Sequence, residues 1–260
     1  AVKGLTKLAR KGNPPPRIAE TPSGILNSVG LQNPGVKTFI EKEIPFLRSY
    51  GIAIIANASG NTIEDYEYMV EILSSADVDG IELNLSCPNV KEGCMSFGST
   101  SNGVFEVVSR VKKKAGKPLI VKLTPNVTDI TEIARAAETA GADSVSLINT
   151  LLGMAIDAKT KRPILGNVTG GLSGPAVKPI ALRMVYQVSK AVKIPIIGMG
   201  GISNGTDAVE FLLAGASAVM LGTAGFVNPM AWVETIEGLE KYMIENNVKS
   251  VTELIGGLIA

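Results

Sequence analysis

The feature that most constrains the fold is a regular alternation of short apolar runs with longer segments of helical pattern. The apolar runs are rich in Val, Ile, Leu and Ala and cover residues 52–56, 80–85, 119–123, 144–148, 195–199 and 218–221. Such runs are typical of parallel strands that are buried on both faces. Helical patterns lie between them, over 62–74, 103–115, 129–140, 179–192 and 205–214. This alternation predicts an α/β fold.

Polar or glycine residues at the ends of the runs favour a barrel over an open sheet, because barrels collect functional residues at the carboxyl ends of their strands. The residues at these ends are Asn57, Asn84, Lys122, Asn149, Gly200 and Gly222. With residues 1–2 as the tail of one more strand, seven strands are counted where a barrel needs eight. We therefore expect a single (β/α)8 TIM barrel domain over 1–260 that lacks its first strand. Turn-rich segments at 13–31 and 153–174 interrupt the repetition, and we expect hairpins in the first.

The amino-acid composition argues against several classes of function. The net charge is +1 and aromatic residues make up 5%, which argues against a nucleic-acid surface. The longest apolar stretch, 211–227, is interrupted by glycines, so we expect no membrane span and a cytoplasmic protein. There is no His, and the two cysteines form no Cys-x-x-Cys pair. We expect no bound metal or iron–sulfur cluster, and acid–base chemistry falls to Cys, Lys, Asp, Glu or Tyr.

Two patterns at the strand ends suggest an anionic ligand. Glycine-rich segments 198–202 and 221–225 follow adjacent strands, and their backbone N–H groups suit a phosphate, although ordinary tight turns would give the same glycines. Lys122 ends an otherwise apolar strand. A lysine in this position is costly without an anionic partner, so it either forms a structural salt bridge or serves as a cation beneath the electron-poor ring of a bound cofactor.

Amide side chains and one thiol suggest a planar, polar substrate. Amides occur at strand ends or in loops at Asn27, Asn57, Asn84, Asn89 and Asn149, and each alone would be typical of a turn. Cys87 follows the strand 81–85 and precedes the glycine-rich loop 92–103, which we expect to act as a lid. This polar setting favours a reactive thiol over a small buried hydrophobe, whereas Cys94 has no such support.

Taken together, the ordered motifs resemble class 1 dihydroorotate dehydrogenases along the whole chain. The motifs are Lys3-Gly-Leu-Thr6, Glu20-Thr-Pro-Ser-Gly24, Asn27-Ser-Val-Gly-Leu-Gln-Asn33, Asn84-Leu-Ser-Cys-Pro-Asn89, Val121-Lys-Leu-Thr-Pro-Asn126, Ile148-Asn-Thr150, Gly170-Gly-Leu-Ser-Gly174 and Gly198-Met-Gly-Gly201. Two further segments, Asn89-Val-Lys-Glu-Gly93 and Gly30-Leu-Gln-Asn-Pro-Gly35, resemble class 1B, the NAD-linked form. The resemblance implies an FMN-binding (β/α)8 barrel that oxidises dihydroorotate to orotate in pyrimidine biosynthesis.

The resemblance also implies roles for individual residues. Cys87 would be the base that removes the C5 proton while C6 delivers hydride to FMN. FMN would contact Lys3, Gly4, Asn57, Asn84, Lys122, Ile148, Gly174, Gly200, Gly201, Gly222 and Thr223, the last four around its phosphate. The substrate would contact Lys3, Asn27, Ser28, Val29, Gly30, Leu31, Asn84, Asn149 and Thr150. The family's first strand, with a loop that also touches FMN, has no counterpart in this sequence.

Class 1B enzymes pass electrons to a second subunit that carries FAD and a [2Fe–2S] cluster. The resemblance therefore implies such a partner and a heterotetramer built on a dimer of catalytic subunits. Four alternatives remain: a flavin barrel of the dihydropyrimidine dehydrogenase type, a tRNA-dihydrouridine synthase, a flavin-free phosphate-binding barrel, and an inactive scaffold. The dihydropyrimidine type typically has His where this chain has Asn89, and the near-neutral charge disfavours an RNA substrate.

Overall fold

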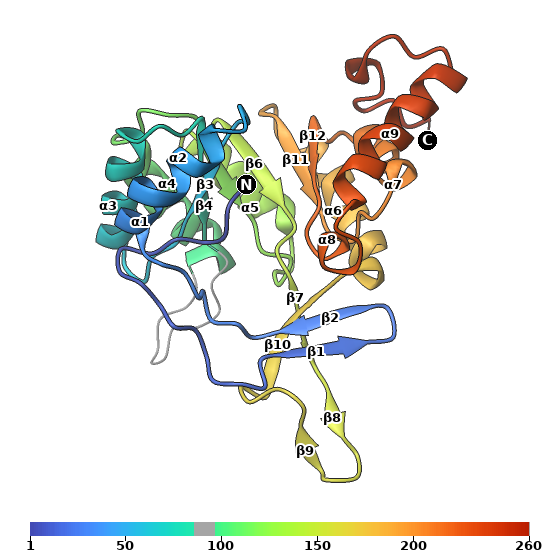
Figure 1. Cartoon of the computed structure of the whole chain (residues 1–260). Coiled ribbons are helices and arrows are strands. Elements are labelled where there is room, and N and C mark those ends of the chain that lie inside the picture. The colour runs from blue at the N-terminus through green and yellow to red at the C-terminus, as the bar shows by residue number, and fades with distance from the viewer. Residues whose placement is uncertain (86–96, 260) are drawn as a thin grey trace. The chain divides into compact units, whose positions relative to one another are not determined.

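A computed structural model describes residues 1–85 and 97–259 and confirms the α/β class (Figure 1). The chain divides into two compact units. Unit 1 comprises Ala1–Pro14, Val29–Leu123 and Glu132–Val145, and unit 2 comprises Pro15–Ser28, Thr124–Thr131 and Ser146–Ala260. Six strands of the main sheet follow the order β12-β11-β6-β5-β4-β3, as expected from the six apolar runs.

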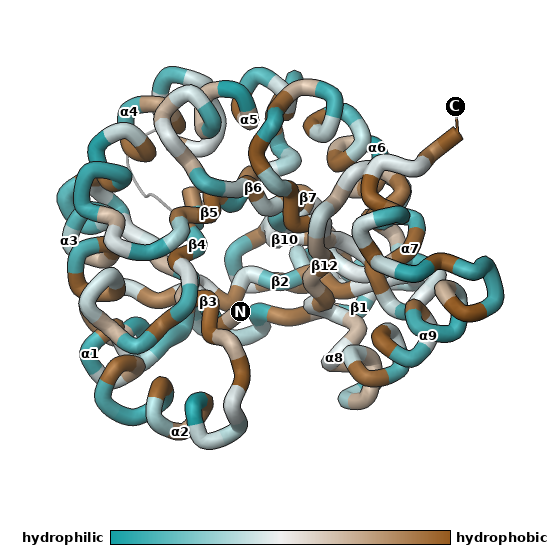
Figure 2. Tube along the Cα trace, turned by 90° about the horizontal axis from the view of Figure 1, so that it is seen from above, coloured by the Kyte–Doolittle hydropathy of each residue, from teal (hydrophilic) through white to brown (hydrophobic). Residues whose placement is uncertain are grey.

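Unit 1 is built around three parallel strands. These are β3 (Ile55–Ala58), β4 (Gly80–Asn84) and β5 (Leu119–Lys122), and β6 (Ser144–Leu147) begins in the same unit. The helices of unit 1 are α1 (Val36–Thr38), α2 (Ile44–Arg48), α3 (Ile63–Ser74), α4 (Ser101–Lys112) and most of α5 (Ile130–Thr139). Figure 2 shows hydrophobic residues along β3 and β5 and a mixture of hydrophobic and hydrophilic residues along α3 and α4. This difference is expected for strands covered on both faces and helices covered on one.

The beginning of the chain lies beside β3. The backbone N–H of Val2 donates to the carbonyl of Ile55, and that of Leu5 donates to the carbonyl of Asn57. Among the described residues, this segment forms one isolated parallel bridge, between Leu5 and Ala58. The predicted seventh strand is therefore present as a short paired segment and not as a full strand.

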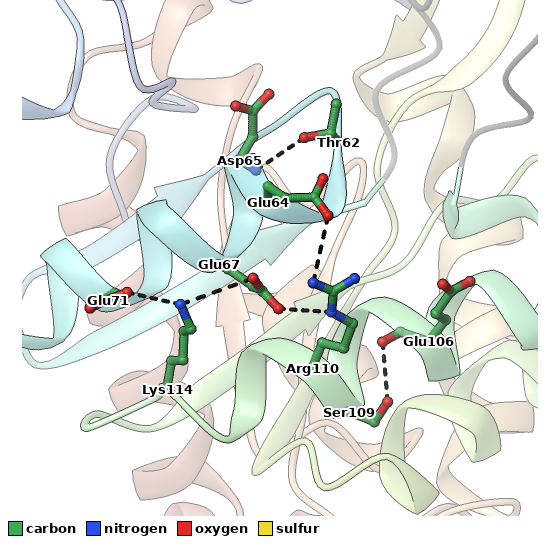
Figure 3. Close-up of polar contacts among 9 residues, drawn as sticks. All are labelled: Thr62, Glu64, Asp65, Glu67, Glu71, Glu106, Ser109, Arg110 and Lys114. Carbon is green, nitrogen blue, oxygen red and sulfur yellow. Dashed lines mark hydrogen bonds and ion pairs between the residues drawn. The ribbon is translucent and has the colours of Figure 1, made fainter.

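Charged residues connect α3 and α4 on their exposed sides (Figure 3). Arg110 lies 2.8 Å from Glu67 and 3.5 Å from Glu64, and Lys114, just beyond α4, lies 3.0 Å from Glu71. The hydrogen bond to Glu67 raises the pKa of Arg110 above its ordinary value. The lysine-rich segment at 112–114 is thus the charged end of α4.

Unit 2 contains the rest of β6, two parallel strands and an antiparallel sheet. The parallel strands are β11 (Ile196–Met199) and β12 (Ala218–Met220). The helices are α6 (Lys178–Ser189), α7 (Gly205–Leu213), α8 (Ala224–Val227) and α9 (Ala231–Glu245). A Cβ on Gly205 would lie 2.6 Å from the Cα of Gly238, so α7 and α9 pack closely where both residues are glycine.

The antiparallel sheet of unit 2 has the order β1-β2-β10-β7. Its strands are β1 (Ile18–Thr21), β2 (Gly24–Asn27), β7 (Leu151–Met154) and β10 (Thr169–Ser173), and β8 (Ile156–Asp157) pairs with β9 (Arg162–Pro163) beside it. The hairpin expected within 13–31 is confirmed as β1–β2. None of the helices in the described part of the chain combines the length and the apolar character that a membrane crossing requires.

Candidate active site

Four polar residues converge where β3, β4 and β5 end. Asn57 is opposite Glu82 in the register of β3 and β4, and Asn84 is opposite Lys122 in that of β4 and β5. Alternate residues of a strand point to the same face, so Glu82 and Asn84 share one side of β4. The strand register therefore gathers an amide, a carboxylate, a second amide and an amine on one face of unit 1.

These side chains form a connected hydrogen-bonded group around a buried carboxylate. Glu82 is 1% exposed, and its Oε2 lies 3.6 Å from Nζ of Lys122. Asn57 donates from Nδ2 to the carboxylate of Glu82, and Asn84 donates from Nδ2 to Oδ1 of Asn57 over 3.3 Å. The hydroxyl of Tyr66, on α3, donates to the backbone carbonyl of Asn84 over 2.9 Å. Such a network fixes side-chain orientation because each buried polar group has a defined partner.

Gly4, one of the residues expected beside a flavin, lies against this group. A Cβ at Gly4 would be 3.0 Å from Oδ1 of Asn57, 3.0 Å from Cδ2 of Leu31 and 3.3 Å from Oγ of Ser59. The predicted residues Gly4, Leu31 and Asn57 thus meet in unit 1. Burial, and then the nearby charge of Lys122, lower the pKa of Lys3 below the ordinary lysine value.

Asn33 holds the loop of residues 29–31 to the beginning of the chain. Its Oδ1 accepts hydrogen bonds from the backbone N–H groups of Thr6 (3.2 Å) and Gly35 (2.9 Å). Its Nδ2 donates to Oγ1 of Thr6 over 2.9 Å and to the carbonyl of Leu31 over 2.7 Å. The predicted substrate residues Val29, Gly30 and Leu31 therefore lie in a segment that hydrogen bonds hold in place. Gly30 and Leu31 both have positive φ.

In unit 2, the expected flavin residues lie at two places. A Cβ on Gly200 would be 3.1 Å from Cγ1 of Ile148, so these two residues are in contact. Gly200 and Gly201 both have positive φ, a conformation that favours glycine. Thr223 donates from Oγ1 to Oγ of Ser173 over 2.8 Å, beside Gly174.

Gly222 precedes Thr223 and borders open space. A Cβ built on Gly222 would meet no atom within 4 Å. The two residues lie between β12 and α8, where the first backbone N–H groups of a helix have no intrahelical acceptor.

The expected substrate residues of unit 2 meet around β10. Nδ2 of Asn27, on β2, donates to the carbonyl of Gly171 over 3.4 Å. A Cβ on Gly171 would lie 2.0 Å from Oγ1 of Thr150, so Thr150 packs directly on this glycine. Asn149 accepts a hydrogen bond from the N–H of Thr150 over 2.8 Å, and Ser28 follows Asn27 at the end of β2.

Other predictions lie outside the described residues. These are the thiol of Cys87, Asn89, Cys94 and the first part of the expected lid. Conversely, sequence reasoning missed Glu82, Asn33 and Ser59. Ser59 is fully buried, and its hydroxyl has no hydrogen-bond partner among the described residues.

Comparison with known proteins places the chain in one family. The family model for dihydroorotate dehydrogenase matches residues 1–243. The catalytic subunit of dihydroorotate dehydrogenase B (NAD(+)) from Alkaliphilus metalliredigens is 62% identical over 257 residues, which are 99% of this chain and 85% of that protein. The proteins of the same name from Thermoanaerobacter pseudethanolicus and Bacteroides thetaiotaomicron are 59% and 60% identical, with the same two shares. The chain therefore belongs to the dihydroorotate dehydrogenase family.

Proposed function

We propose that this chain is the catalytic subunit of an NAD-linked dihydroorotate dehydrogenase, which oxidises dihydroorotate to orotate in pyrimidine biosynthesis with FMN as its cofactor. The observation that carries the proposal is the arrangement of Asn57, Asn84 and Lys122 around one face of β3, β4 and β5, in a chain about 60% identical to proteins of that name. This arrangement places two amides and a cation at the ends of neighbouring strands.

The residues present fit FMN. The backbone of Gly222 borders open space that a phosphate could use, and the buried hydroxyl of Ser59 has no partner among the described residues. Gly200, beside Ile148, and Gly201, beside Lys178, both adopt positive φ. We propose that Gly200, Gly201, Gly222 and Thr223 hold the phosphate.

The remaining FMN residues would surround the ring system. These are Lys3, Gly4, Asn57, Asn84, Lys122, Ile148 and Gly174. When bound, FMN would accept the hydride that leaves C6 of dihydroorotate.

The chain's own residues would hold the substrate and move one proton. Lys122 supplies a positive charge, and Asn84 supplies an amide that is fixed by its bond to Asn57. Lys3, residues 27–31, Asn84, Asn149 and Thr150 would bind orotate, whose carboxylate and ring amides call for cations and amide side chains. Cys87 would take the proton from C5, the role that the family resemblance implies, and a thiolate base is compatible with a chain that has no histidine.

The electrons would leave through a separate subunit. The relatives are named as catalytic subunits of an NAD(+) enzyme, which supports a partner that carries the NAD-reducing centres. We propose a partner with FAD and a [2Fe–2S] cluster, in a heterotetramer around a dimer of this chain.

Two measurements test the proposal. The purified protein should show a flavin spectrum that is bleached anaerobically by dihydroorotate and not by dihydrouracil. Bleaching by dihydrouracil alone would instead support the dihydropyrimidine dehydrogenase type, and absence of a flavin after reconstitution with FMN would refute the proposal.

The variant Cys87→Ser tests the base. It should slow bleaching at neutral pH by about 10²–10⁴-fold, the usual contribution of a general base. With a free thiol pKa of about 8.5, the wild-type rate should rise through mildly alkaline pH. A rate within about tenfold of wild type would refute Cys87 as the base.

A further inference from the structure

Glu82 is a buried carboxylate to which the proposed chemistry gives no role. It lies within the apolar strand β4 and is 1% exposed. A charge at such depth is costly unless other groups pair with it. Its partners include Nζ of Lys122, 3.6 Å away, and Nδ2 of Asn57. Both partners are proposed to contact FMN, so the position of Glu82 connects it to the site.

We infer that Glu82 is a positioning residue that holds Lys122 and sets the orientation of the amides of Asn57 and Asn84 for the flavin and substrate. The inference rests on the proposed function and deepens it, because it assigns the carboxylate behind the flavin-facing residues. Glu82 acts through these residues and does not itself touch the ligand.

The hydrogen bonds around Glu82 have a defined direction. An ionised carboxylate only accepts, so the amide of Asn57 must turn its Nδ2 toward Glu82. Its Oδ1 then faces Asn84, which must present its own Nδ2 over 3.3 Å. One carboxylate thereby fixes two amides that could otherwise flip by exchanging oxygen and nitrogen. A neutral glutamine at position 82 could donate or accept and would not impose this direction.

Glu82 also offsets the charge of Lys122. Lys122 has a side chain that is 18% exposed, and Glu82 is the carboxylate next to it. In a site of low dielectric constant the carboxylate cancels much of the field of the ammonium group. Removing this negative charge would strengthen the positive field of Lys122 at the proposed FMN site, and a stronger positive field favours the reduced flavin because a hydride adds negative charge.

The experiment compares four variants of the FMN-loaded protein at pH 6.5. These are Glu82→Gln, Lys122→Gln, the double variant, and the control Glu71→Gln, which removes an exposed carboxylate that pairs with Lys114 on the surface. Midpoint potentials are measured by dye-coupled reduction. The midpoint potential does not depend on turnover. If Glu82 had a merely structural role, its replacement would not shift the potential in a way that depends on the presence of Lys122.

We expect Glu82→Gln to raise the ratio of reduced to oxidised FMN at a fixed potential at least tenfold, which for a two-electron couple is about 30 mV. The shift should be absent when Lys122→Gln is already present, and Glu71→Gln should leave the potential unchanged. A shift that persists without Lys122, a shift of opposite sign, or no shift would overturn the inference. If Glu82→Gln does not fold, Glu82→Asp, which keeps the charge but withdraws it by one methylene, should give a smaller shift of the same sign.

A measurement on FMN-free protein separates this inference from the proposed function. The side-chain ¹⁵N–H resonances of Asn57 and Asn84 should both move in Glu82→Gln and stay in place in Glu71→Gln. If only the resonance of Asn57 moves, the relay to Asn84 is refuted. If the wild type fails to bind FMN, the proposed function fails, whereas the amide resonances still decide whether Glu82 orients the two side chains.

Discussion

Asp207 anchors the loop after β11, and its replacement by asparagine should destabilise unit 2. The carboxylate, on α7, is 6% exposed. It accepts hydrogen bonds from the backbone N–H of Ser203 (2.9 Å), the hydroxyl of Ser203 (2.8 Å) and Nζ of Lys178 (2.6 Å). Its own N–H donates to Oδ1 of Asn204, which caps α7. These bonds close the segment that contains Gly200 and Gly201.

The expected decrease in the free energy of unfolding follows from those contacts. In Asp207→Asn the charge is lost, and one carbonyl oxygen must replace two carboxylate oxygens while an NH₂ group faces a donor. Lys178 keeps Glu210, 2.8 Å away, so it is not left without a counter-ion. Hydrogen bonds to charged groups are worth about 1.5–3 kcal/mol, so we expect a loss of about 2–3 kcal/mol. For a chain of this size that corresponds to a decrease in Tm of roughly 4–12 °C.

The pH dependence gives a second, independent test. Burial acts to raise the pKa of Asp207, but the hydrogen bonds from Lys178 and Ser203 outweigh it and leave the pKa below its ordinary value. The stabilisation is therefore fully present above the pKa of an unfolded aspartate, about 3.9, and is lost as the pH falls through the lower pKa of the folded state. The hydrogen bonds to Asp207 and Glu210 raise the pKa of Lys178, so its contribution is present below about 10.4 and is lost only as the pH rises through the raised value.

Thermal and urea unfolding of wild type and Asp207→Asn at pH 7 and near pH 2.5 measure both effects. The difference between the two proteins should be large at pH 7 and should shrink in acid. Asp77→Asn, which removes an exposed partner of Arg48, is the matched control and should shift Tm by less than about 2 °C. Equal stability of wild type and Asp207→Asn at pH 7, or an undiminished difference in acid, would refute the reasoning.

Three further substitutions probe other parts of the chain. Gly200→Ala, at a φ of +121° with the new Cβ 2.9 Å from that of Ala181, should weaken FMN binding at least tenfold in a fluorescence titration, and unchanged affinity would contradict the placement of this loop at the phosphate. Tyr66→Phe removes the hydroxyl that donates to the carbonyl of Asn84 and should lower the free energy of unfolding in urea by about 1 kcal/mol. Equal stability of this variant and the wild type would contradict the prediction. Arg110→Gln removes the partly exposed ion pairs to Glu67 and Glu64 (Figure 3) and should change Tm by less than about 2 °C, and less still at high salt. A large shift would mean that these pairs are more than surface contacts.

The five helices predicted from the sequence correspond to α3, α4, α5, α6 and α7, and their ends agree closely because helix ends depend on local chemistry, whereas α1, α2, α8 and α9 were not predicted. Thr62 accepts a hydrogen bond from the N–H of Asp65 and caps α3 at the predicted boundary. Asp129 likewise accepts from the N–H of Thr131 at the start of α5, and Gly141 takes a positive φ just after its end. A cap involves residues two or three positions apart, so a single sequence contains the information.

Strand boundaries and long-range pairing depended on information that local patterns lack. The run at 52–56 predicted a strand, but β3 is Ile55–Ala58, and Ile52 is 48% exposed. The observed strand β3 lies closer to the polar end of this run than predicted. The reason is that the beginning of the chain hydrogen-bonds to residues 55–59 and that the carboxylate of Glu82 accepts a hydrogen bond from the amide of Asn57. In the same way β2 pairs with β10 far along the chain, and no feature near either strand indicates its partner.

The polar residues on β3, β4 and β5 show why some residues of the candidate site could be predicted from the sequence and others could not. Asn57, Asn84 and Lys122 stood out because each follows or ends an apolar run, which is where α/β proteins place functional groups. Glu82 lies two positions before Asn84, inside the run, where a rule about strand ends does not look. Yet the alternation of Ile81, Glu82, Leu83 and Asn84 already requires that the carboxylate and the amide face the same side of the strand. A charge that shares a face with a candidate ligand group in a buried strand is therefore itself a candidate for the site, since the residues that compensate it must lie on the neighbouring strands of that face.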